Sequence, residues 1–447
     1  MKILWALFSS MFCSLLGYGQ WSTLTLPAGR YSIMAENIGD TIFFSSGTMN
    51  SGFLYSKIDR YDANTNTWLP QLTIPQSRSF AGSTVLGHKA YFGGGTQNQS
   101  SVLNSVDIYD NATATWSSAS LSKARMFLAC THAGNKVLFA GGIQDWSSLT
   151  TLNVVDIYDA SANTWSAHTL SVPRALIGSA TDGNVAIFAG GAIGNGNVTD
   201  AVDIYNAITN IWTTAKLSEA RAECNVAYYN GKFYIAGGHL AGAYNVTGTV
   251  DIYDIASNTW SKIAPLPTPR GDARAVVLAD KLFFAGGENV NLNTFILGQT
   301  FDDVDIYNAI TNTWSSAKLS NNSGNPGVVA SANKVFIGGG YSSSTFSIHN
   351  IIDIYTETPS GIENVSITET KINIFPNPSS KFLNINYDNN SNIRLDNFSI
   401  INSEGREIAS NYLTKLIDIS HLQNGHYFIC FKKGNSIRLS KKFSIIH

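Results

Sequence analysis

The stretch that decides the fold is residues 137–142, VLFAGG, followed by residues 155–159, VDIYD, and residues 163–165, NTW. An almost unbroken apolar run is typical of a β-strand that is covered on both faces. Two glycines at its end allow positive φ angles and the close approach of another segment. The VDIYD string alternates Val and Ile with Asp and Tyr, and it predicts another strand of the same sheet.

The same sequence pattern recurs along the chain at intervals of about 50 residues, which is typical of a repeat protein. Tryptophans set the register: Trp21, Trp68, Trp116, Trp165, Trp212, Trp260 and Trp314. Glycine pairs recur with them: Gly94-Gly95, Gly141-Gly142, Gly190-Gly191, Gly237-Gly238, Gly286-Gly287 and Gly339-Gly340. An arginine opens six of the units: Arg30, Arg78, Arg125, Arg174, Arg221 and Arg270.

Each unit predicts four short strands. The first follows the arginine, the second is the apolar run, the third carries Val-Asp-Ile-Tyr, and the fourth ends in the tryptophan. Turns such as Gly134-Asn135 and Asn230-Gly231 predict a tight hairpin between the first two. Four-stranded units of this length are the blades of a β-propeller, because a single such sheet cannot bury both of its faces.

The two ends of the array predict how the ring closes. The last unit has no following tryptophan, whereas Trp21 precedes Arg30 with no earlier unit to complete. We therefore expect the N-terminal segment to pair with residues 352–355 as the outermost strand of the seventh blade. This closure would remove an exposed sheet edge.

These residues resemble the Kelch family, whose blades carry a glycine pair followed by Tyr-Asp and Trp. The resemblance covers residues 20–356 and implies an all-β, seven-bladed Kelch-type propeller. Two units depart from the pattern, with Ser46-Gly47 in place of the glycine pair and Ser323 in place of the arginine. The residues that typify the structural repeat are Arg125, Gly141, Gly142, Tyr158 and Trp165.

The N terminus and the composition predict an exported protein. Residues 1–19 combine Lys2 with a short apolar run and small residues, as a signal peptide does. No later apolar stretch is long enough to span a membrane. A net charge of −2 gives no indication of nucleic acid or an anionic membrane as a partner. The cysteines that remain (Cys130, Cys224 and Cys430) are odd in number and do not form a disulfide framework.

The C-terminal region reads as a separate domain. Residues 357–370 lack the repeat and predict a linker, and residues 371–447 predict a small Ig-like β-sandwich from short strands between Pro, Asn and Gly. Pro376-Asn377-Pro378 and Gly425-His426-Tyr427 resemble motifs of the sorting domain of type IX secretion cargo in Bacteroidetes. The resemblance implies the secretion machinery as a partner of residues 371–447, and export through the periplasm to the cell surface or the medium. The alternative is an ordinary carbohydrate- or matrix-binding sandwich.

The positions where the repeat breaks supply the candidate site residues. Two residues after the arginine, the first four units have Ser32, Phe80, Phe127 and Leu176, whereas the last three have Glu223, Asp272 and Asn325. Two residues further, Asn225 and Arg274 replace small or apolar residues. Because innermost strands converge on the hub, we expect one polar sector in the central channel. The structural alternative is a hydrogen-bonded lining around channel water.

We expect Arg221, Arg270 and Arg274 to lower the pKa of Glu223 and Asp272, so that both stay ionised. If repulsion between the carboxylates prevails instead, one of them holds a proton near neutrality. We expect the arginine ring to be structural, with each guanidinium bonding carbonyls of an adjacent blade. A functional anion-binding ring is the alternative.

Variable loops after the glycine pairs supply the other candidates, because binding residues concentrate on such loops. These candidates are Trp146, His239, Tyr244, Glu288, Phe295 and Tyr341.

The sequence favours an exported binding protein without intrinsic catalysis, metal or cofactor, which presents a ligand face to a protein or a glycan. The Cys, Tyr and His constellation that a Kelch-type copper-radical oxidase needs is not present. One alternative is a sugar-modifying enzyme, resembling a Kelch-type sialic acid epimerase, that uses Glu223, Asp272 and Arg274. A second alternative is a structural adhesin or matrix component.

Overall fold

The computed structural model describes residues 20–97, 101–292, 294, 296–345, 347–357, 373–386, 397–402, 407–412, 414–433 and 436–446. All of its regular secondary structure in these ranges is β, so the prediction of an all-β chain is confirmed. The expected signal peptide, most of the expected linker and Phe295 lie outside the described residues. The chain divides into two compact units, one within Gly19–Glu357 and one within Thr358–His447.

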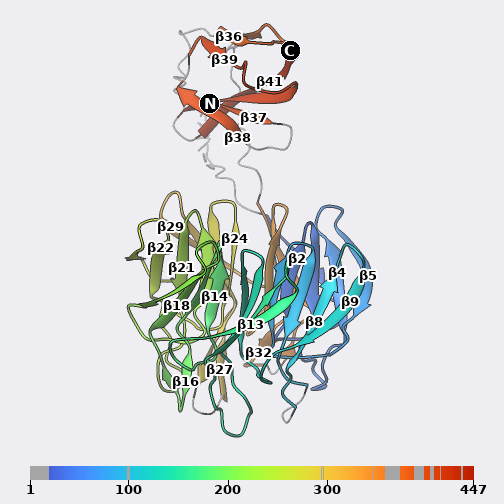
Figure 1. Cartoon of the computed structure of the whole chain (residues 1–447), viewed down its shortest axis with the longest axis vertical. Coiled ribbons are helices and arrows are strands. Elements are labelled where there is room, and N and C mark those ends of the chain that lie inside the picture. Colours follow the sequence, from blue (N-terminus) through green and yellow to red (C-terminus); the bar gives the residue numbers. More distant parts are fainter. Residues whose placement is uncertain are drawn as a thin grey trace, which may run out of the picture. The chain divides into compact units, whose positions relative to one another are not determined.

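The larger unit contains a series of four-stranded antiparallel sheets, which stand side by side in Figure 1. Within the described residues there are seven of them. In chain order, the first two sheets are β2 (Met34–Ile38), β3 (Thr41–Ser45), β4 (Lys57–Asp62) and β5 (Thr67–Thr73), then β6 (Gly82–Leu86), β7 (Lys89–Gly93), β8 (Ser105–Asp110) and β9 (Thr115–Ser120). The third and fourth are β10 (Ala129–Ala133), β11 (Lys136–Ala140), β12 (Val154–Asp159) and β13 (Thr164–Thr169), then β14 (Gly178–Thr181), β15 (Val185–Ala189), β18 (Ala201–Asn206) and β19 (Ile211–Lys216). The fifth and sixth are β20 (Asn225–Tyr229), β21 (Lys232–Ala236), β22 (Val250–Asp254) and β23 (Thr259–Ile263), then β24 (Arg274–Leu278), β25 (Lys281–Ala285), β28 (Asp303–Asn308) and β29 (Thr313–Lys318).

The remaining four-stranded sheet of this unit joins the two ends of the array. It consists of β30 (Gly327–Ser331), β31 (Lys334–Gly338), β34 (Ile351–Thr356) and the N-terminal strand β1 (Gln20–Thr25). Strand β1 pairs antiparallel with β34, and Trp21 lies opposite Tyr355. The expected pairing of the N-terminal segment with residues 352–355 is therefore confirmed.

The first strands of neighbouring sheets contact one another in sequence order, from β2 through β6, β10, β14, β20 and β24 to β30, and β30 contacts β2. Each second strand is buried between the sheets. Strand β11, for example, has Val137, Leu138, Phe139 and Ala140 all without exposed surface. A strand covered on both faces explains the unbroken apolar runs that define the repeat.

The tryptophans pack across the two outer strands of each sheet. In the third unit Trp165 lies opposite Tyr158, with the ring centroids 5.1 Å apart. The Tyr158 hydroxyl donates to Asn163 Oδ1 in the connecting turn, at 2.8 Å. The prediction that the fourth strand ends in the tryptophan is wrong, because Trp165 is the second residue of β13. Cross-strand packing against the tyrosine requires it at the start of that strand.

The glycine pairs provide the contact between successive sheets. The Gly142 N–H donates to the carbonyl of Arg174 in the next sheet, at 3.0 Å. Gly141 has a φ of 63°, and a Cβ built on it would lie 2.3 Å from the same carbonyl. The predicted need for a close approach and a positive φ is confirmed here. The loops after three glycine pairs form small hairpins: β16 (Ala192–Gly194) with β17 (Asn197–Val198), β26 (Glu288–Asn291) with β27 (Ile296–Thr300), and β32 (Tyr341–Ser342) with β33 (Ser347–Ile348).

The smaller unit has two antiparallel sheets around one core, to which Leu383, Ile417, Ile400, Phe431 and Phe443 contribute. One sheet has the order β35 (Asn373–Phe375), β36 (Phe382–Asn386), β39 (Leu416–Asp418). The other has the order β38 (Glu407–Tyr412), β37 (Asn397–Asn402), β40 (Gly425–Lys433), β41 (Ser436–Ile445).

Candidate functional site

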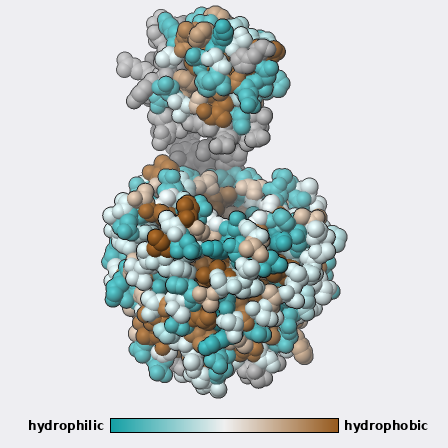
Figure 2. Space-filling view, in the orientation of Figure 1, coloured by the Kyte–Doolittle hydropathy of each residue, from teal (hydrophilic) through white to brown (hydrophobic). Residues whose placement is uncertain are grey.

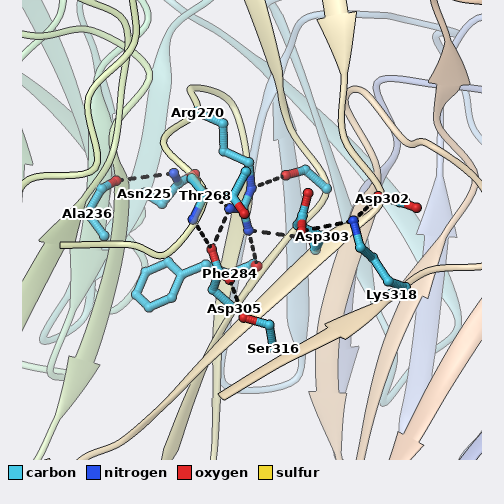
Figure 3. Close-up of polar contacts among 11 residues, drawn as sticks. Asn225, Ala236, Thr268, Arg270, Phe284, Asp302, Asp303, Asp305, Ser316 and Lys318 are labelled. Carbon is cyan, nitrogen blue, oxygen red and sulfur yellow. Dashed lines mark hydrogen bonds and ion pairs between the residues drawn. The ribbon is translucent and has the colours of Figure 1, made fainter. Parts of the chain in front are cut away.

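The repeated arginines form buried ion pairs inside their own sheets. Figure 3 shows Arg270 as the example. Its Nη1 lies 2.5 Å from Asp305 Oδ2, and its Nε and Nη2 donate to the carbonyls of Gly286 and Phe284 at 2.6 and 2.7 Å. Asp305 also accepts from the Ser316 hydroxyl at 2.9 Å. The equivalent pairs are Arg30–Asp59, Arg78–Asp107, Arg125–Asp156, Arg174–Asp203 and Arg221–Asp251.

The predicted bonding of each arginine side chain to an adjacent blade is therefore wrong. Asp305 and Phe284 belong to β28 and β25, in the sheet that Arg270 itself precedes. The link to the neighbouring sheet runs instead through the arginine's backbone carbonyl, which accepts from the glycine pair. A guanidinium without exposed surface that is surrounded by its own sheet cannot bind a ligand.

The positions two residues after the arginine follow one another in a ring, and backbone hydrogen bonds join five of its seven neighbouring pairs. The Leu176 N–H donates to Phe127 O at 3.1 Å, the Glu223 N–H to Leu176 O at 2.8 Å, and the Asp272 N–H to Glu223 O at 3.1 Å. The Phe127 and Ser32 N–H groups make the same bond to their predecessors. All seven of these residues have φ between 48° and 56°, namely Ser32, Phe80, Phe127, Leu176, Glu223, Asp272 and Asn325. The backbone conformation is therefore common to every sheet, and only the side chains differ.

Around this ring the structure brings Glu223 together with His239, which comes from the loop after a glycine pair. Glu223 Oε2 lies 2.8 Å from His239 Nδ1. The Val290 N–H donates to His239 Nε2 at 3.0 Å. Because Nε2 accepts that bond, a proton is carried by Nδ1, which faces Glu223.

Asp272, Arg274, Asn325 and Glu288 form the adjoining part of the cluster. Arg274 Nη2 lies 3.3 Å from Asp272 Oδ1 and donates to Asn325 Oδ1 at 2.9 Å. Asn325 Nδ2 donates to Glu288 Oε1 at 3.5 Å. Asp272 Oδ2 and Glu288 Oε2 are buried without a hydrogen-bond partner in the described part of the chain. We call the six residues Glu223, His239, Asp272, Arg274, Glu288 and Asn325 the polar sector.

Burial dominates the protonation of the polar sector. It is the main reason that the pKa of Asp272 is raised to about 7, a net value that includes the opposing effect of Arg274 and the added effect of Glu223. Burial and the neighbouring Asp272 also raise the pKa of Glu288 well above its usual value. The prediction that arginines keep Asp272 ionised is therefore wrong. Arg221 and Arg270 are paired with Asp251 and Asp305 instead, and the opposing effects of Arg274, His239 and Asn325 do not offset the cost of desolvation.

Two glycines make room for the loop side chains of the polar sector, and the sequence reasoning missed them. They occupy the position directly after the arginine, where other sheets have Tyr31, Ser79, Met126, Ala175 and Ala222. A Cβ on Gly271 would lie 2.0 Å from His239 Nδ1, and a Cβ on Gly324 would lie 2.7 Å from the Tyr341 ring. The signal was available, because two consecutive units lose their side chain at the same repeat position.

The other predicted site residues lie in different surroundings. Trp146 packs with Phe80 and Phe127, with ring centroids 5.9 and 5.5 Å from its own, as part of an apolar wall on other sheets. Tyr341 is buried and lies edge-on against Tyr31. Tyr244 is 40% exposed. Asn225 donates to the carbonyl of Ala236 in its own sheet, which gives it a structural contact (Figure 3).

The first strands enclose a channel cavity of about 320 Å³. Glu223, Asp272, Arg274 and Asn325 line it on one side, and Phe80, Phe127 and Leu176 also line it. A further acid, Glu36, was not predicted as a site residue. It accepts from the Ser83 hydroxyl at 2.6 Å, and burial raises its pKa to about 7. Within the described residues no group of three or more His, Cys, Asp or Glu side chains is arranged to hold a metal ion.

The face of the larger unit seen in Figure 2 is mostly hydrophilic or weakly polar, with smaller hydrophobic patches. In the described ranges, no helix has the length and apolar character that crossing a bilayer requires.

Comparison with known proteins identifies both units. Residues 178–371 match the KLHDC2/KLHL20/DRC7 Kelch-repeats domain, and residues 373–446 match the secretion system C-terminal sorting domain. The solved structure of YjhT resembles this chain with a TM-score of 0.51 and 16% identity, over 66% of this chain and 99% of that chain. No curated protein matches.

The chain thus contains a Kelch-repeat domain within a unit of propeller-like fold. Its C-terminal unit is a sorting domain of the type that marks a protein for export to the cell surface or the medium.

Proposed function

We propose that this chain is an exported binding protein whose ligand site is the mouth of the channel beside the polar sector. In this proposal the sheets are the blades of a seven-bladed Kelch propeller that β1 closes, and the C-terminal unit is an Ig-like sandwich. The ring of contacts between first strands supports the closed arrangement. The ligand is a glycan or a protein.

One observation carries the assignment of the site. The residues that break the repeat gather at one place, although they come from three sheets and two loops. Glu223, Asp272 and Asn325 occur at positions where the backbone does the structural work, so their side chains have no shared architectural role. Clustered polar side chains beside an apolar wall in a cavity are typical of ligand sites.

The test of binding compares wild-type protein with the double variant Glu223→Gln, Asp272→Asn on a glycan array and against surface proteins of neighbouring cells. Loss of a hit at unchanged melting temperature supports the site. Retained binding with lowered stability would assign the polar sector to architecture alone.

The test of export removes residues 371–447. No repeat residue lies there, so we expect the larger unit to fold and to remain in the periplasm. Normal amounts of the truncated protein at the cell surface or in the medium would contradict the role of the sorting domain.

A second candidate, a sugar-modifying enzyme that uses Glu223, Asp272 and Arg274, is favoured by the raised pKa of Asp272. A carboxyl group with a pKa of about 7 suits general acid or base chemistry at neutral pH. Proton NMR of free sugars incubated with the protein tests it, because turnover changes the anomeric signals and Asp272→Asn abolishes the change.

A further inference from the structure

The sheet that contains β34 keeps the acid of the repeated ion pair but lacks its arginine. In the six other four-stranded sheets of the larger unit, an arginine without exposed surface pairs with the Asp of the third strand. Strand β34 carries the equivalent acid, Asp353, whereas Ser323 occupies the position of the arginine. Asp353 is only 8% exposed. A buried carboxylate therefore remains in this sheet without the guanidinium that neutralises its counterparts.

The hydrogen bonds of Asp353 show that the cation alone is missing. Asp203 accepts from the N–H and the hydroxyl of Ser171, both at 3.0 Å, and pairs with Arg174 at 2.7 Å. Asp353 accepts from the N–H and the hydroxyl of Ser320 in the same way, at 3.1 and 2.5 Å. Among the described residues it has no ion pair with a Lys, Arg or His side chain. Carboxylates are rarely buried unless a cation pairs with them.

Ser323 replaces one of the hydrogen bonds that the arginine makes elsewhere. Its hydroxyl donates to the carbonyl of Gly339 at 2.8 Å, as Nε of Arg270 donates to the carbonyl of Gly286 at 2.6 Å. The two Nη groups of Arg270 bond Asp305 and further carbonyls (Figure 3). A serine is too short to supply counterparts of these groups, so the part of the ion pair that carries the charge is absent.

A second acceptor at this place also has no partner. His349 occupies the loop position equivalent to Tyr55, because each donates its N–H at 2.9 Å to the second residue of the glycine pair in its own sheet. The Tyr55 ring centroid lies 4.1 Å from Cζ of Arg30. His349 Nε2 is buried without a hydrogen-bond partner among the described residues, while the ring bonds the backbone of Asn322. Burial lowers the pKa of His349, so the imidazole is neutral at pH 7 and Nε2 is an acceptor.

We propose that this place binds a guanidinium group supplied from outside the chain. The cation pairs with the carboxylate of Asp353, and one of its N–H groups donates to Nε2 of His349. A guanidinium carries donors and no acceptor, so it matches a place where the unpaired groups are acceptors. The six repeated ion pairs are the precedent, because each places a guanidinium at the equivalent position of its sheet.

This site is distinct from the channel. Ser323, His349 and Asp353 do not line the channel cavity. The inference therefore goes beyond the function proposed above and does not depend on it. The group that binds comes either from a small guanidinium compound or from an arginine side chain of a peptide.

The experiment measures thermal unfolding of the full-length protein in about 50 mM guanidinium chloride or tetramethylammonium chloride. Both cations carry one positive charge, but tetramethylammonium has no N–H donor. Ser323→Arg supplies the guanidinium within the chain and shares any denaturing effect of the salt. We expect guanidinium to raise the melting temperature of the wild type by about 1–2 °C relative to its effect on Ser323→Arg. Tetramethylammonium should produce no such difference.

Two further measurements make the test specific. Ser161→Arg is the matched control, because it adds the same side chain at an exposed turn residue and should keep the response to guanidinium. In the wild type, the nitrogen NMR signal of His349 Nε2 should shift as guanidinium is added, since this atom gains a hydrogen bond. The same signal in Ser323→Arg should not respond.

Three outcomes would overturn the proposal. They are a guanidinium response of the wild type no larger than that of Ser323→Arg, an equal response of the wild type to tetramethylammonium, and a Ser323→Arg protein that melts below the wild type. In the last case the position does not accept a guanidinium. N-acetyl-L-arginine amide then identifies the source: a matching His349 shift indicates an arginine side chain, and a shift with guanidinium ion alone indicates a small compound.

Discussion

Replacing Asp272 by Asn should make the protein more stable at alkaline pH and leave its stability near pH 4 unchanged. In the folded protein the pKa of Asp272 is about 7, compared with about 3.9 in an unfolded chain. The folded state therefore holds the proton more tightly. The contribution of this proton to the free energy of unfolding is fully present below about pH 4 and declines as the pH rises towards 7.

The size of the expected stabilisation follows from the pKa shift of Asp272. Three pKa units at 1.36 kcal/mol each give an upper bound of about 4 kcal/mol for the cost of ionising Asp272. The variant also loses the charge attraction to Arg274, and protonation of the neighbouring Glu288 reduces the cost of ionising Asp272 in the wild type. We therefore expect a net stabilisation of about 2 kcal/mol at pH 8, which corresponds to a few degrees in melting temperature.

The assay is thermal unfolding of wild type and Asp272→Asn at pH 5, 6, 7 and 8. The difference in melting temperature should grow with pH across this range. Asp40→Asn, at an exposed turn residue, changes the net charge equally and should show no such growth. A difference that stays constant from pH 5 to 8, or a variant that is less stable at pH 8, would refute the reasoning.

Three further predictions address the architecture. Arg270→Met leaves Asp305 buried without its cation, so the free energy of unfolding should fall by about 3–5 kcal/mol; an unchanged melting temperature would contradict the pairing. Gly271→Ala places a Cβ 2.0 Å from His239 Nδ1 and should shift the His239 NMR signals and abolish ligand binding, whereas Gly425→Ala, whose nearest neighbour is 3.6 Å away, should not. Deleting residues 20–28 exposes the edge of β34 and should cause aggregation visible by light scattering, and a soluble monomeric product would be evidence against closure by β1.

The fold was predictable because the residues that meet each packing requirement of one sheet recur in the sequences of the other sheets. The apolar runs, glycine pairs and Tyr–Trp pairs each correspond to one packing requirement. The Arg–Asp pairs were missed, although the Asp of VDIYD recurs among buried neighbours, where a charge needs a partner. Their residues are far apart in the sequence, and only the sheet register brings Arg270 beside Asp305.

The grouping of the polar side chains was predictable, but their protonation was not. Glu223, Asp272 and Asn325 were grouped correctly because equivalent repeat positions are neighbours in space. His239 and Glu288 were predicted only as loop residues, because the sequence of a loop does not indicate which other residues the loop will contact. The protonation of Asp272 was predicted wrongly, because desolvation depends on how completely the surrounding elements cover a carboxyl group.

In the proposed site, backbone hydrogen bonds hold the rim of the channel, whereas the side chains determine which ligand binds. Because N–H and C=O groups hold the ring, Ser, Phe, Leu, Glu, Asp and Asn all occupy its seven positions. The φ angles near 50° disfavour β-branched side chains, and Val, Ile and Thr are absent from the ring. A different ligand could be accommodated by exchanging a few side chains among the residue types that tolerate this backbone conformation, while the backbone of the rim stays the same.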